Sequence, residues 1–496
     1  MRTLLLAFFL AASPALAIDR AALEKLASGD NDEKVEAIGA LLAEGDPEAA
    51  AVLAKFAEGE VVVDGKAVEV VVNNRLRSAV ADALAALRLL SPERAVRLEA
   101  AKALAGGADA SMLALVRKAL EKETDPDIKP LLDLTAASME MASGDKQTRL
   151  AAIRRLGESN SPNSRTLLAE AATDSDAEIR IAAQKSLREV QGKLAWGERA
   201  GLLFAGISLG SILLLAALGL AITYGLMGVI NMAHGELIMI GAYTTYVVQN
   251  LFKANFPGAF DWYLLAAVPA SFVFSALVGM ALERLVIRWL YGRPLETLLA
   301  TWGISLMLIQ SVRSIFGAAN VQVENPAFMS GGIQAFAGVV LPWSRIGIIV
   351  FAVAVLISIW LLLTRTRLGL FVRSVTQNRD MASCVGVPTA RVDTWAFGLG
   401  SGIAGLAGCA LSQIGNVGPD LGQSYIIDSF MVVVLGGVGQ LAGTVYAALT
   451  LGFANKFLES VSGAVIAKIA VLVFIIFFIQ RRPQGLFAVK GRAADA

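Results

Sequence analysis

Long apolar runs in the second part of the chain constrain its fold more than any other feature. Between residues 201 and 480 charged residues are scattered, and each apolar run approaches the roughly 20 residues that a helix needs to cross a bilayer. Lipid offers no hydrogen-bond partners, so the backbone of such a segment has to satisfy itself, as an α-helix does. We therefore expect an all-α membrane domain of about nine spans. They lie near residues 201–223, 234–250, 262–283, 297–316, 345–364, 394–413, 424–440, 442–459 and 463–480.

One pair of these segments has a second interpretation. Gly436-Gly437-Val438-Gly439 interrupts the apolar run between residues 424–440 and 442–459. Glycine-rich backbone of this kind is tolerated at membrane depth when protein surrounds it. The pair is therefore either two spans or one re-entrant element.

The preceding part of the chain, residues 18–195, is dense in charged residues and has the periodicity of amphipathic helices. A phrase of the form basic-apolar-x-Ala-x-x-x-Leu recurs there, starting at Lys34, Arg97, Arg149 and Arg180. Residues 124–127 and 173–176 look like equivalent loops. This recurrence predicts stacked helix pairs of the HEAT or armadillo kind. A plain helical bundle is the alternative.

One insertion in this part carries a hairpin signal. Asp64-Gly65 separates two runs rich in valine, at residues 61–63 and 68–72. A two-residue Asp-Gly turn between such runs is typical of a β-hairpin. We expect a hairpin at this position.

The first residues of the chain indicate a secretory signal peptide. Arg2 precedes a short apolar stretch at residues 4–12, and Ala15-Leu16-Ala17 has an A-x-A cleavage pattern. An uncleaved anchor is disfavoured because the apolar stretch falls short of the roughly 18 residues that a spanning helix needs. We expect removal of residues 1–17 and export of residues 18–195.

Basic residues between the spans predict the orientation. With an exported amino-terminal domain and an odd number of crossings, the cytoplasm receives the basic segments 284–293, 365–391 and 481–482. The segments assigned to the outside hold only Lys253 and, at a boundary, Arg345. This bias follows the positive-inside rule. It places the amino-terminal domain in the periplasm and the carboxyl terminus in the cytoplasm of an inner-membrane protein.

Charge balance and motif content exclude several functions. The chain has 43 basic and 42 acidic residues, so it lacks the basic surplus of a nucleic-acid binder. His234 is the only histidine, and neither a metal-ligand motif nor a G-x-x-x-x-G-K-[ST] phosphate loop occurs. We expect no metal, no cofactor and no nucleotide hydrolysis by this chain itself. The G-x-G-x-x-G at residues 400–405 lies in an apolar helix, where small residues favour close helix packing.

The longest cytoplasmic segment, residues 365–393, mixes apolar and charged residues. A short amphipathic helix around Asn378 to Cys384 would leave Met381, Ala382 and Val385 available to dock on a partner, with Gly386 ending the helix. Attraction of its basic residues to anionic lipid is the alternative.

Asn231, His234 and Glu236 lie close to a predicted membrane boundary. Ionisable side chains beside a span usually face a cavity or a partner rather than lipid. These three residues are therefore candidates for a substrate pathway. In the alternative, Asn231 and His234 hydrogen-bond a broken backbone between two spans.

Four motifs, in order along the chain, carry a family resemblance. They are Tyr224-Gly225 with Ile230-Asn231-Met232-Ala233-His234-Gly235-Glu236; Asn378-Arg379-Asp380-Met381-Ala382 with Gly386; Val432-Val433-Val434-Leu435-Gly436-Gly437-Val438-Gly439 with Gly443; and Arg482-Pro483-Gln484-Gly485-Leu486-Phe487. Together they resemble the LivH-type permeases of branched-chain amino acid ABC importers, and we assign residues 196–490 to such a domain. The second motif is similar to the cytoplasmic coupling segment of that family. We therefore expect Asn378, Arg379, Ala382 and Gly386 to transmit ATPase closure to the spans.

The exported domain departs from the family pattern, in which the first span comes almost at the start. An extension of this kind resembles the first permease subunit of the urea-transport branch. The resemblance implies a permease that moves urea, or a short amide, with ATP hydrolysed on separate subunits. It also implies a LivM-like second permease, two cytoplasmic ATPases and a periplasmic substrate-binding protein as partners, with membrane lipid around the spans.

Three other functions stay open at this point. A branched-chain amino acid permease shares the same motifs. A stand-alone secondary transporter or channel needs acids near the membrane midplane, for which Asp428 is a candidate. A membrane-anchored scaffold explains the extension but leaves the spans and the loop motif without a purpose.

Overall fold

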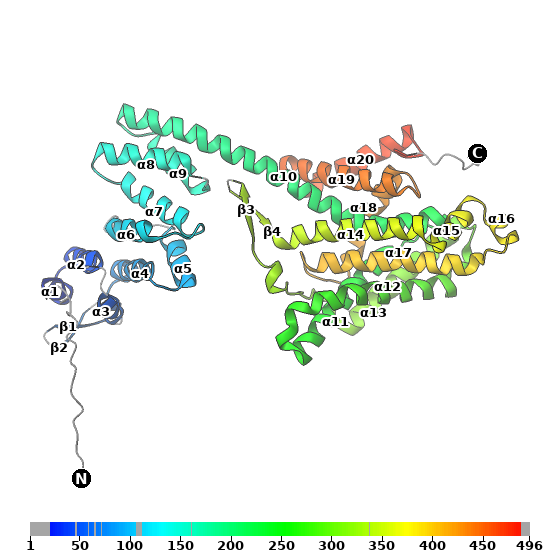
Figure 1. Cartoon of the computed structure of the whole chain (residues 1–496), viewed down its shortest axis with the longest axis horizontal. Coiled ribbons are helices and arrows are strands. Elements are labelled where there is room, and N and C mark those ends of the chain that lie inside the picture. Colours follow the sequence, from blue (N-terminus) through cyan, green and yellow to red (C-terminus); the bar gives the residue numbers. More distant parts are fainter. Residues whose placement is uncertain are drawn as a thin grey trace, which may run out of the picture. The chain divides into compact units, whose positions relative to one another are not determined.

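The computed structural model describes residues 20–44, 47–57, 59–63, 66–70, 72–105, 112–159, 161–336 and 338–487 (Figure 1). The signal peptide predicted at residues 1–17 lies outside them. Helices dominate the described residues, which confirms the prediction of a mostly helical chain. The chain divides into two compact units, with the boundary between Trp196 and Gly197.

The first unit consists of short helices and one hairpin. Its elements are α1 (Arg20–Ser28), α2 (Asn31–Glu44), α3 (Pro47–Ala57), β1 (Glu60–Val63), β2 (Lys66–Glu69), α4 (Asn74–Arg88), α5 (Arg94–Leu104), α6 (Leu113–Lys122), α7 (Lys129–Met141), α8 (Lys146–Glu158), α9 (Pro162–Ala171) and the first part of α10 (Ala177–Met227). Apolar side chains at helical spacing form a core in which Leu26, Leu53 and Phe56 are fully buried. The Asp145 carboxylate caps α8 by accepting the Thr148 N–H at 2.9 Å.

The hairpin predicted in the first unit is present. β1 and β2 pair antiparallel, with Glu60 opposite Glu69 and Val63 opposite Lys66. That register leaves two residues between the strands, as expected for an Asp-Gly turn. The turn residues themselves lie outside the described residues.

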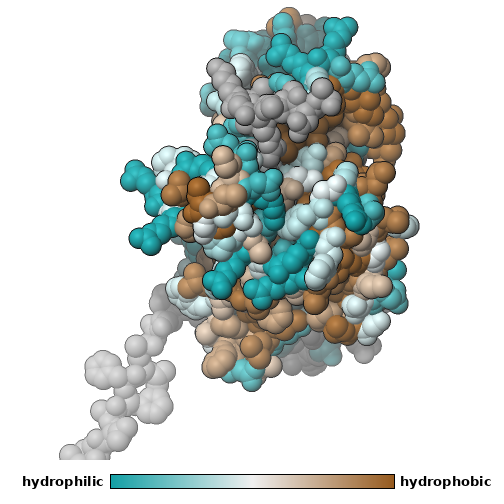
Figure 2. All heavy atoms as spheres, turned by 90° about the vertical axis from the view of Figure 1, so that its right-hand side faces the viewer, coloured by the Kyte–Doolittle hydropathy of each residue, from teal (hydrophilic) through white to brown (hydrophobic). Residues whose placement is uncertain are grey.

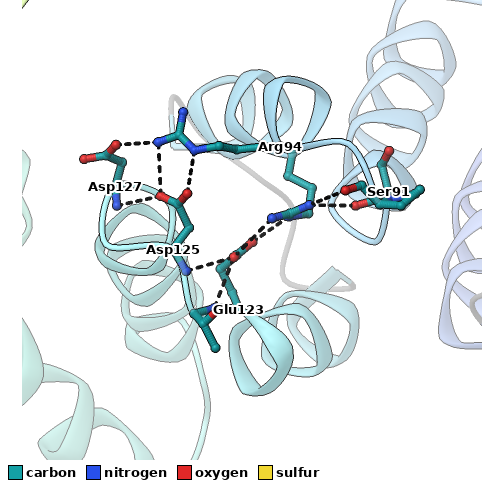
Figure 3. Close-up of polar contacts among 8 residues, drawn as sticks. Ser91, Arg94, Glu123, Asp125 and Asp127 are labelled. Atoms are coloured by element: carbon teal, nitrogen blue, oxygen red, sulfur yellow. Dashed lines mark hydrogen bonds and ion pairs between the residues drawn. The ribbon is translucent and has the colours of Figure 1, made fainter.

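Ion pairs tie α5 to the loop that follows α6 (Figure 3). The Arg94 guanidinium lies 2.6 Å from a carboxylate oxygen of Asp125 and 2.6 Å from one of Asp127. Arg97 Nε lies 2.8 Å from a carboxylate oxygen of Glu123. This hydrogen bond from Arg97 holds the pKa of Glu123 below its usual value.

The next pair of helices repeats this arrangement. Lys146, at the start of α8, lies 2.8 Å from Asp176 and 2.9 Å from Glu178. Arg149, also on α8, pairs with Asp174 in the loop that follows α9. The two loops expected to be equivalent therefore make similar contacts: acidic residues of the first loop lie against basic residues of α5, and those of the second lie against basic residues of α8.

The second unit is built of longer helices. After the rest of α10, its elements are α11 (His234–Asn255), η2 (Pro257–Trp262), α12 (Tyr263–Leu285), η3 (Ile287–Leu290), α13 (Pro294–Phe316), η4 (Ala327–Met329), β3 (Gly332–Phe336), β4 (Val339–Pro342), α14 (Trp343–Arg365), α15 (Arg367–Gln377), α16 (Arg379–Cys384), α17 (Thr389–Ser412), α18 (Leu421–Gly436), α19 (Leu441–Ser462) and α20 (Ala464–Arg481). β3 and β4 pair antiparallel. The all-α prediction misses this hairpin because both strands are short and lie in a long stretch expected to be a loop.

Six helices among the described residues are long and apolar enough to cross a membrane: α10, α12, α13, α14, α17 and α20. The other three predicted spans coincide with α11, α18 and α19. α18 has only 16 residues. α11 carries buried polar side chains, such as Thr245 and Gln249, which neighbouring helices enclose. The number of nine crossings thus stays a prediction.

α17 lies at the centre of the second unit and packs against α11 and α12 (Figure 1). Its side chains are almost all buried, whereas α14 and α20 leave most of theirs uncovered. A Cβ atom on Gly408 would lie 2.7 Å from the backbone nitrogen of Ala242 on α11. One on Gly405 would crowd the backbone of Ser271 on α12. Gly405, within the predicted 400–405 motif, and Gly408 just after it therefore permit close helix packing, as their apolar context predicts.

Candidate functional site

The helical backbone is broken at residues 228–233, between α10 and α11. Gly228 allows the break because it adopts φ +65°, a conformation that side chains disfavour. The Asn231 side-chain oxygen accepts the Ala233 N–H at 3.0 Å. The Thr301 hydroxyl of α13 accepts the Met232 N–H at 3.1 Å. Two polar side chains thus satisfy the backbone that the break exposes.

His234 joins the two helices that the break separates. It is the first residue of α11, it is fully buried, and its Nε2 lies 2.9 Å from the Ala216 carbonyl oxygen of α10. Because that acceptor is a carbonyl, Nε2 carries the proton and donates it. These contacts fit the structural interpretation of the histidine.

A row of hydroxyl groups on α13 faces this break. Thr297, Thr301 and Ser305 recur every four residues on the buried face of α13. Ser305 lies close to the buried Glu236 carboxyl group. Among the described residues, one Glu236 oxygen and the Asn231 amide nitrogen have no hydrogen-bond partner. The four-residue spacing of these hydroxyls is visible in the sequence, and it is the signal that would have added Thr301 and Ser305 to the candidates.

A cavity of about 250 Å³ adjoins the break. Its walls include Leu220, Tyr224, Ile230, Asn231, Leu298 and Phe430. Asn231 is only 2% exposed, and it supplies an amide group in a lining that is otherwise almost entirely apolar. Among the residues that the structure describes, none of those lining the cavity is charged. Of the three predicted pathway residues, Asn231 lines the cavity, whereas His234 and Glu236 are buried and are not among its lining residues.

A second break, between α18 and α19, touches the end of α10, just before the first break. Gly437 and Gly439 adopt φ +101° and +81° there. A Cβ atom on Gly225 would lie 2.8 Å from the Gly439 nitrogen. The carboxyl-terminal segment closes over the same place, since the Leu486 N–H donates to the Leu435 carbonyl at 2.8 Å. Three motifs that are far apart in the sequence, at residues 224–236, 432–443 and 482–487, therefore meet in space.

The predicted coupling segment forms α15 and α16. The Asn378 side chain caps α16 by accepting the Met381 N–H at 2.9 Å. Gly386 ends the segment at φ +88°. Met381 and Val385 are 64% and 77% exposed. Ala382, which the sequence predicts to be available for docking, is instead only 4% exposed, because it packs against α15 and α17.

Arg379 connects α16 to the helices behind it. It pairs with the buried Asp393 of α17, and its guanidinium lies 4.7 Å from the centre of the Tyr291 ring. The Thr394 hydroxyl donates to the buried Glu283 carboxylate at 2.6 Å. Tyr291, Asp393 and Thr394 were not among the site residues predicted from the sequence. A carboxylate beside an otherwise apolar run was the available signal for Asp393. Figure 2 looks onto the end of the unit with α15 and α16, where hydrophilic side chains gather beside hydrophobic surface.

Comparison with known proteins places these motifs in a family context. Residues 202–480 match the family described as "Branched-chain amino acid transport system / permease component". The chain is 29% identical to the high-affinity branched-chain amino acid transport system permease protein BraD of Pseudomonas aeruginosa, over 57% of this chain and 93% of that protein. It is 28% identical to the corresponding LivH of Escherichia coli, over 57% of this chain and 94% of LivH. No solved structure matches the chain.

Proposed function

The chain belongs to the family of branched-chain amino acid transport permease components, and we propose that it is the permease subunit of an ABC importer that moves urea or a short amide across the inner membrane. Its relatives BraD and LivH are named as transport system permease proteins. In this proposal, partner subunits hydrolyse ATP, and the permease exposes its pathway alternately to each side.

The first unit is the observation that carries the choice of urea. The matched part of this chain is 57% of its length, and it covers 93% of BraD and 94% of LivH. The unmatched parts of BraD and LivH are therefore too short to contain a counterpart of residues 18–195. An exported HEAT-like domain in that position resembles the urea branch of the family. The cavity beside Asn231 supports a neutral solute, since it offers an amide group and no fixed charge.

A branched-chain amino acid is the second candidate substrate. The printed names of BraD and LivH assign them that transport, and the apolar cavity wall suits an aliphatic side chain. The carboxylate and ammonium of an amino acid would still need charged partners, which this cavity does not supply.

The proposed assembly contains a LivM-like second permease, two cytoplasmic ATPases and a periplasmic substrate-binding protein. Residues 1–17 are the proposed signal peptide, residues 18–195 are periplasmic, and the carboxyl terminus is cytoplasmic. One contact supports this orientation: Arg288 lies within 3.4 Å of the Ala390 carbonyl oxygen. Two of the basic segments assigned to the cytoplasm therefore lie together.

The proposed roles follow the two sites. Asn378, Arg379, Ala382 and Gly386 couple the permease to its ATPases, with Ala382 acting through packing. Asn231, His234 and Glu236 form and support the substrate pathway. Asn231 contacts the solute, whereas His234 and Glu236 hold the break that presents it.

Uptake of labelled urea and labelled leucine tests the proposed substrate. Cells lacking this gene, with and without a copy restored in trans, are compared at low external solute concentration. We expect the deletion to lose energised urea uptake and the restored copy to recover it, with leucine uptake unchanged. Loss of leucine uptake while urea uptake persists would transfer the function to the second candidate.

A further inference from the structure

Tyr291 lies between the coupling segment and the first helix break. It follows η3, in the short connection that leads to α13. The Arg379 guanidinium of α16 lies over its ring, 4.7 Å from the ring centre. Its hydroxyl lies 3.5 Å from the sulfur of Met227, the last residue of α10. One side chain therefore touches both elements.

The break side of this contact is packed. Val229, within the break, clusters with the fully buried Ile287 and Phe397, and Met227 and Tyr291 pack against the same cluster. The break continues from there to Asn231 at the cavity wall. Interiors packed in this way pass on displacements because they leave little free space.

Charged residues hold the α16 side of the Tyr291 contact. Arg379 pairs with Asp393, whose side chain is almost fully buried on α17. The Tyr291 hydroxyl also donates to Glu283 at 3.3 Å. Burial, together with the carboxylates of Asp393 and Glu283, raises the pKa of Tyr291, so the phenol stays protonated and remains a donor at physiological pH. Asp393 thus holds the Arg379 guanidinium, and Glu283 holds the Tyr291 hydroxyl.

We propose that Tyr291 is a positioning residue that links the position of α16 to the backbone break at residues 228–233. When a partner moves α16, the Arg379 guanidinium shifts the Tyr291 ring, and the ring shifts Met227 and the break behind it. The cavity wall at Asn231 changes as a result. This inference rests on the proposed importer function, because it supplies the path by which the coupling segment reaches the pathway.

Two substitutions separate the contacts of Tyr291. Tyr291→Phe keeps the ring beneath Arg379 but removes the hydroxyl that reaches Met227 and Glu283. Tyr291→Leu also removes the aromatic face that attracts the guanidinium. Tyr246→Phe is the matched control, because Tyr246 lies on α11 and its ring contacts Phe316.

The measurement is the number of solute molecules taken up per ATP hydrolysed by the complete complex in proteoliposomes, with labelled urea and labelled leucine assayed separately. We expect Tyr291→Phe to lower this ratio at least about fivefold, the lower end of typical coupling factors, and Tyr291→Leu to lower it further. Melting temperature is recorded in parallel. A lower ratio at an unchanged melting temperature supports a positioning role, since a purely structural role would change both together.

A double substitution sharpens the test. Arg379→Lys keeps a cation for Asp393 but loses the planar stack on the ring. Combined with Tyr291→Leu, it should lower the ratio little more than either change alone, since both break one link. Ratios equal to wild type in both Tyr291 variants, or additive losses, would overturn the inference. Absence of ATP-driven uptake by the wild-type complex would instead refute the importer proposal.

Discussion

The backbones of Gly225 and Gly439 pack directly against each other where the end of α10 meets the break between α18 and α19. A Cβ atom on Gly225 would lie 2.8 Å from the Gly439 nitrogen and closer still to its Cα. Gly225 cannot carry a side chain unless the two backbones separate, whereas a side chain on Gly439 would find ordinary contacts and is opposed by its φ of +81°. The contact holds the end of α10 against the second break, next to the cavity that Tyr224 and Asn231 line.

Gly225→Ala should destabilise the second unit. The added methyl group has no space, and overpacking of this kind typically costs about 1–3 kcal/mol. Gly303→Ala is the control, because Gly303 is also helical and has no atom within 4 Å of its Cβ position. Thermal unfolding in detergent measures both variants. Equal melting temperatures would show that the close approach is not needed.

His234→Ala should lower stability more than it changes transport. The substitution removes the hydrogen bond to the Ala216 carbonyl and leaves a buried space, and loss of such a bond costs about 1–3 kcal/mol. Transport per folded complex should change little. His234→Gln, which keeps a donor, should recover part of the stability. A folded His234→Ala complex with altered substrate preference would favour direct contact with the solute.

Gly386→Val should uncouple ATP hydrolysis from uptake while membrane insertion persists. Gly386 adopts φ +88° in open space, so backbone strain alone opposes the substitution. A β-branched residue tolerates that conformation poorly, whereas asparagine adopts positive φ more readily. Gly386→Asn should therefore retain most of the coupling. The ratio of uptake to hydrolysis distinguishes them, and wild-type ratios in both variants would remove Gly386 from the coupling role.

The two cysteines of the chain provide a test of orientation. Cys384 in α16 is exposed and Cys409 in α17 is buried. A membrane-impermeant maleimide should label Cys384 in inside-out vesicles and leave intact spheroplasts unlabelled. Cys384→Ser should abolish the signal. Lys185→Cys, at an exposed position in the first unit, should show the opposite pattern on the Cys384→Ser background. Labelling of Cys384 in intact spheroplasts would invert the topology.

The contact between Arg97 and Glu123 should make the first unit acid-sensitive. Because the hydrogen bond from Arg97 lowers the Glu123 pKa, its stabilisation is present above the ordinary value of 4.5 and is lost as the pH falls below 4.5 through the lowered pKa. The protection factors of amide hydrogens in α5 and α6, corrected for the intrinsic exchange rate at each pH, should therefore decrease below pH 4.5. Glu123→Gln should weaken this pH dependence, and Glu121→Gln, at an exposed position on α6, should preserve it. An unchanged profile in Glu123→Gln would exclude the contact as the cause.

Features that depend on neighbouring residues could be predicted from the sequence. Apolar length marked the helices of the second unit, and the Asp-Gly pair marked the β1–β2 hairpin, because helix and turn geometry are set within a few residues. Asn378 and Gly386 were placed at the two ends of α16 for the same reason, since capping is local. The family motifs could be recognised because each consists of a short run of neighbouring residues.

Contacts between distant segments were decided only by the tertiary structure. The meeting of Gly225 with Gly439 depends on how whole helices pack, and so does the burial of Ala382 against α15 and α17. Tyr291 has no local signal, because its partners lie on α10, α12 and α16. The sequence determines which side chains are available. Close packing determines their partners, because it brings together surfaces that lie far apart along the chain.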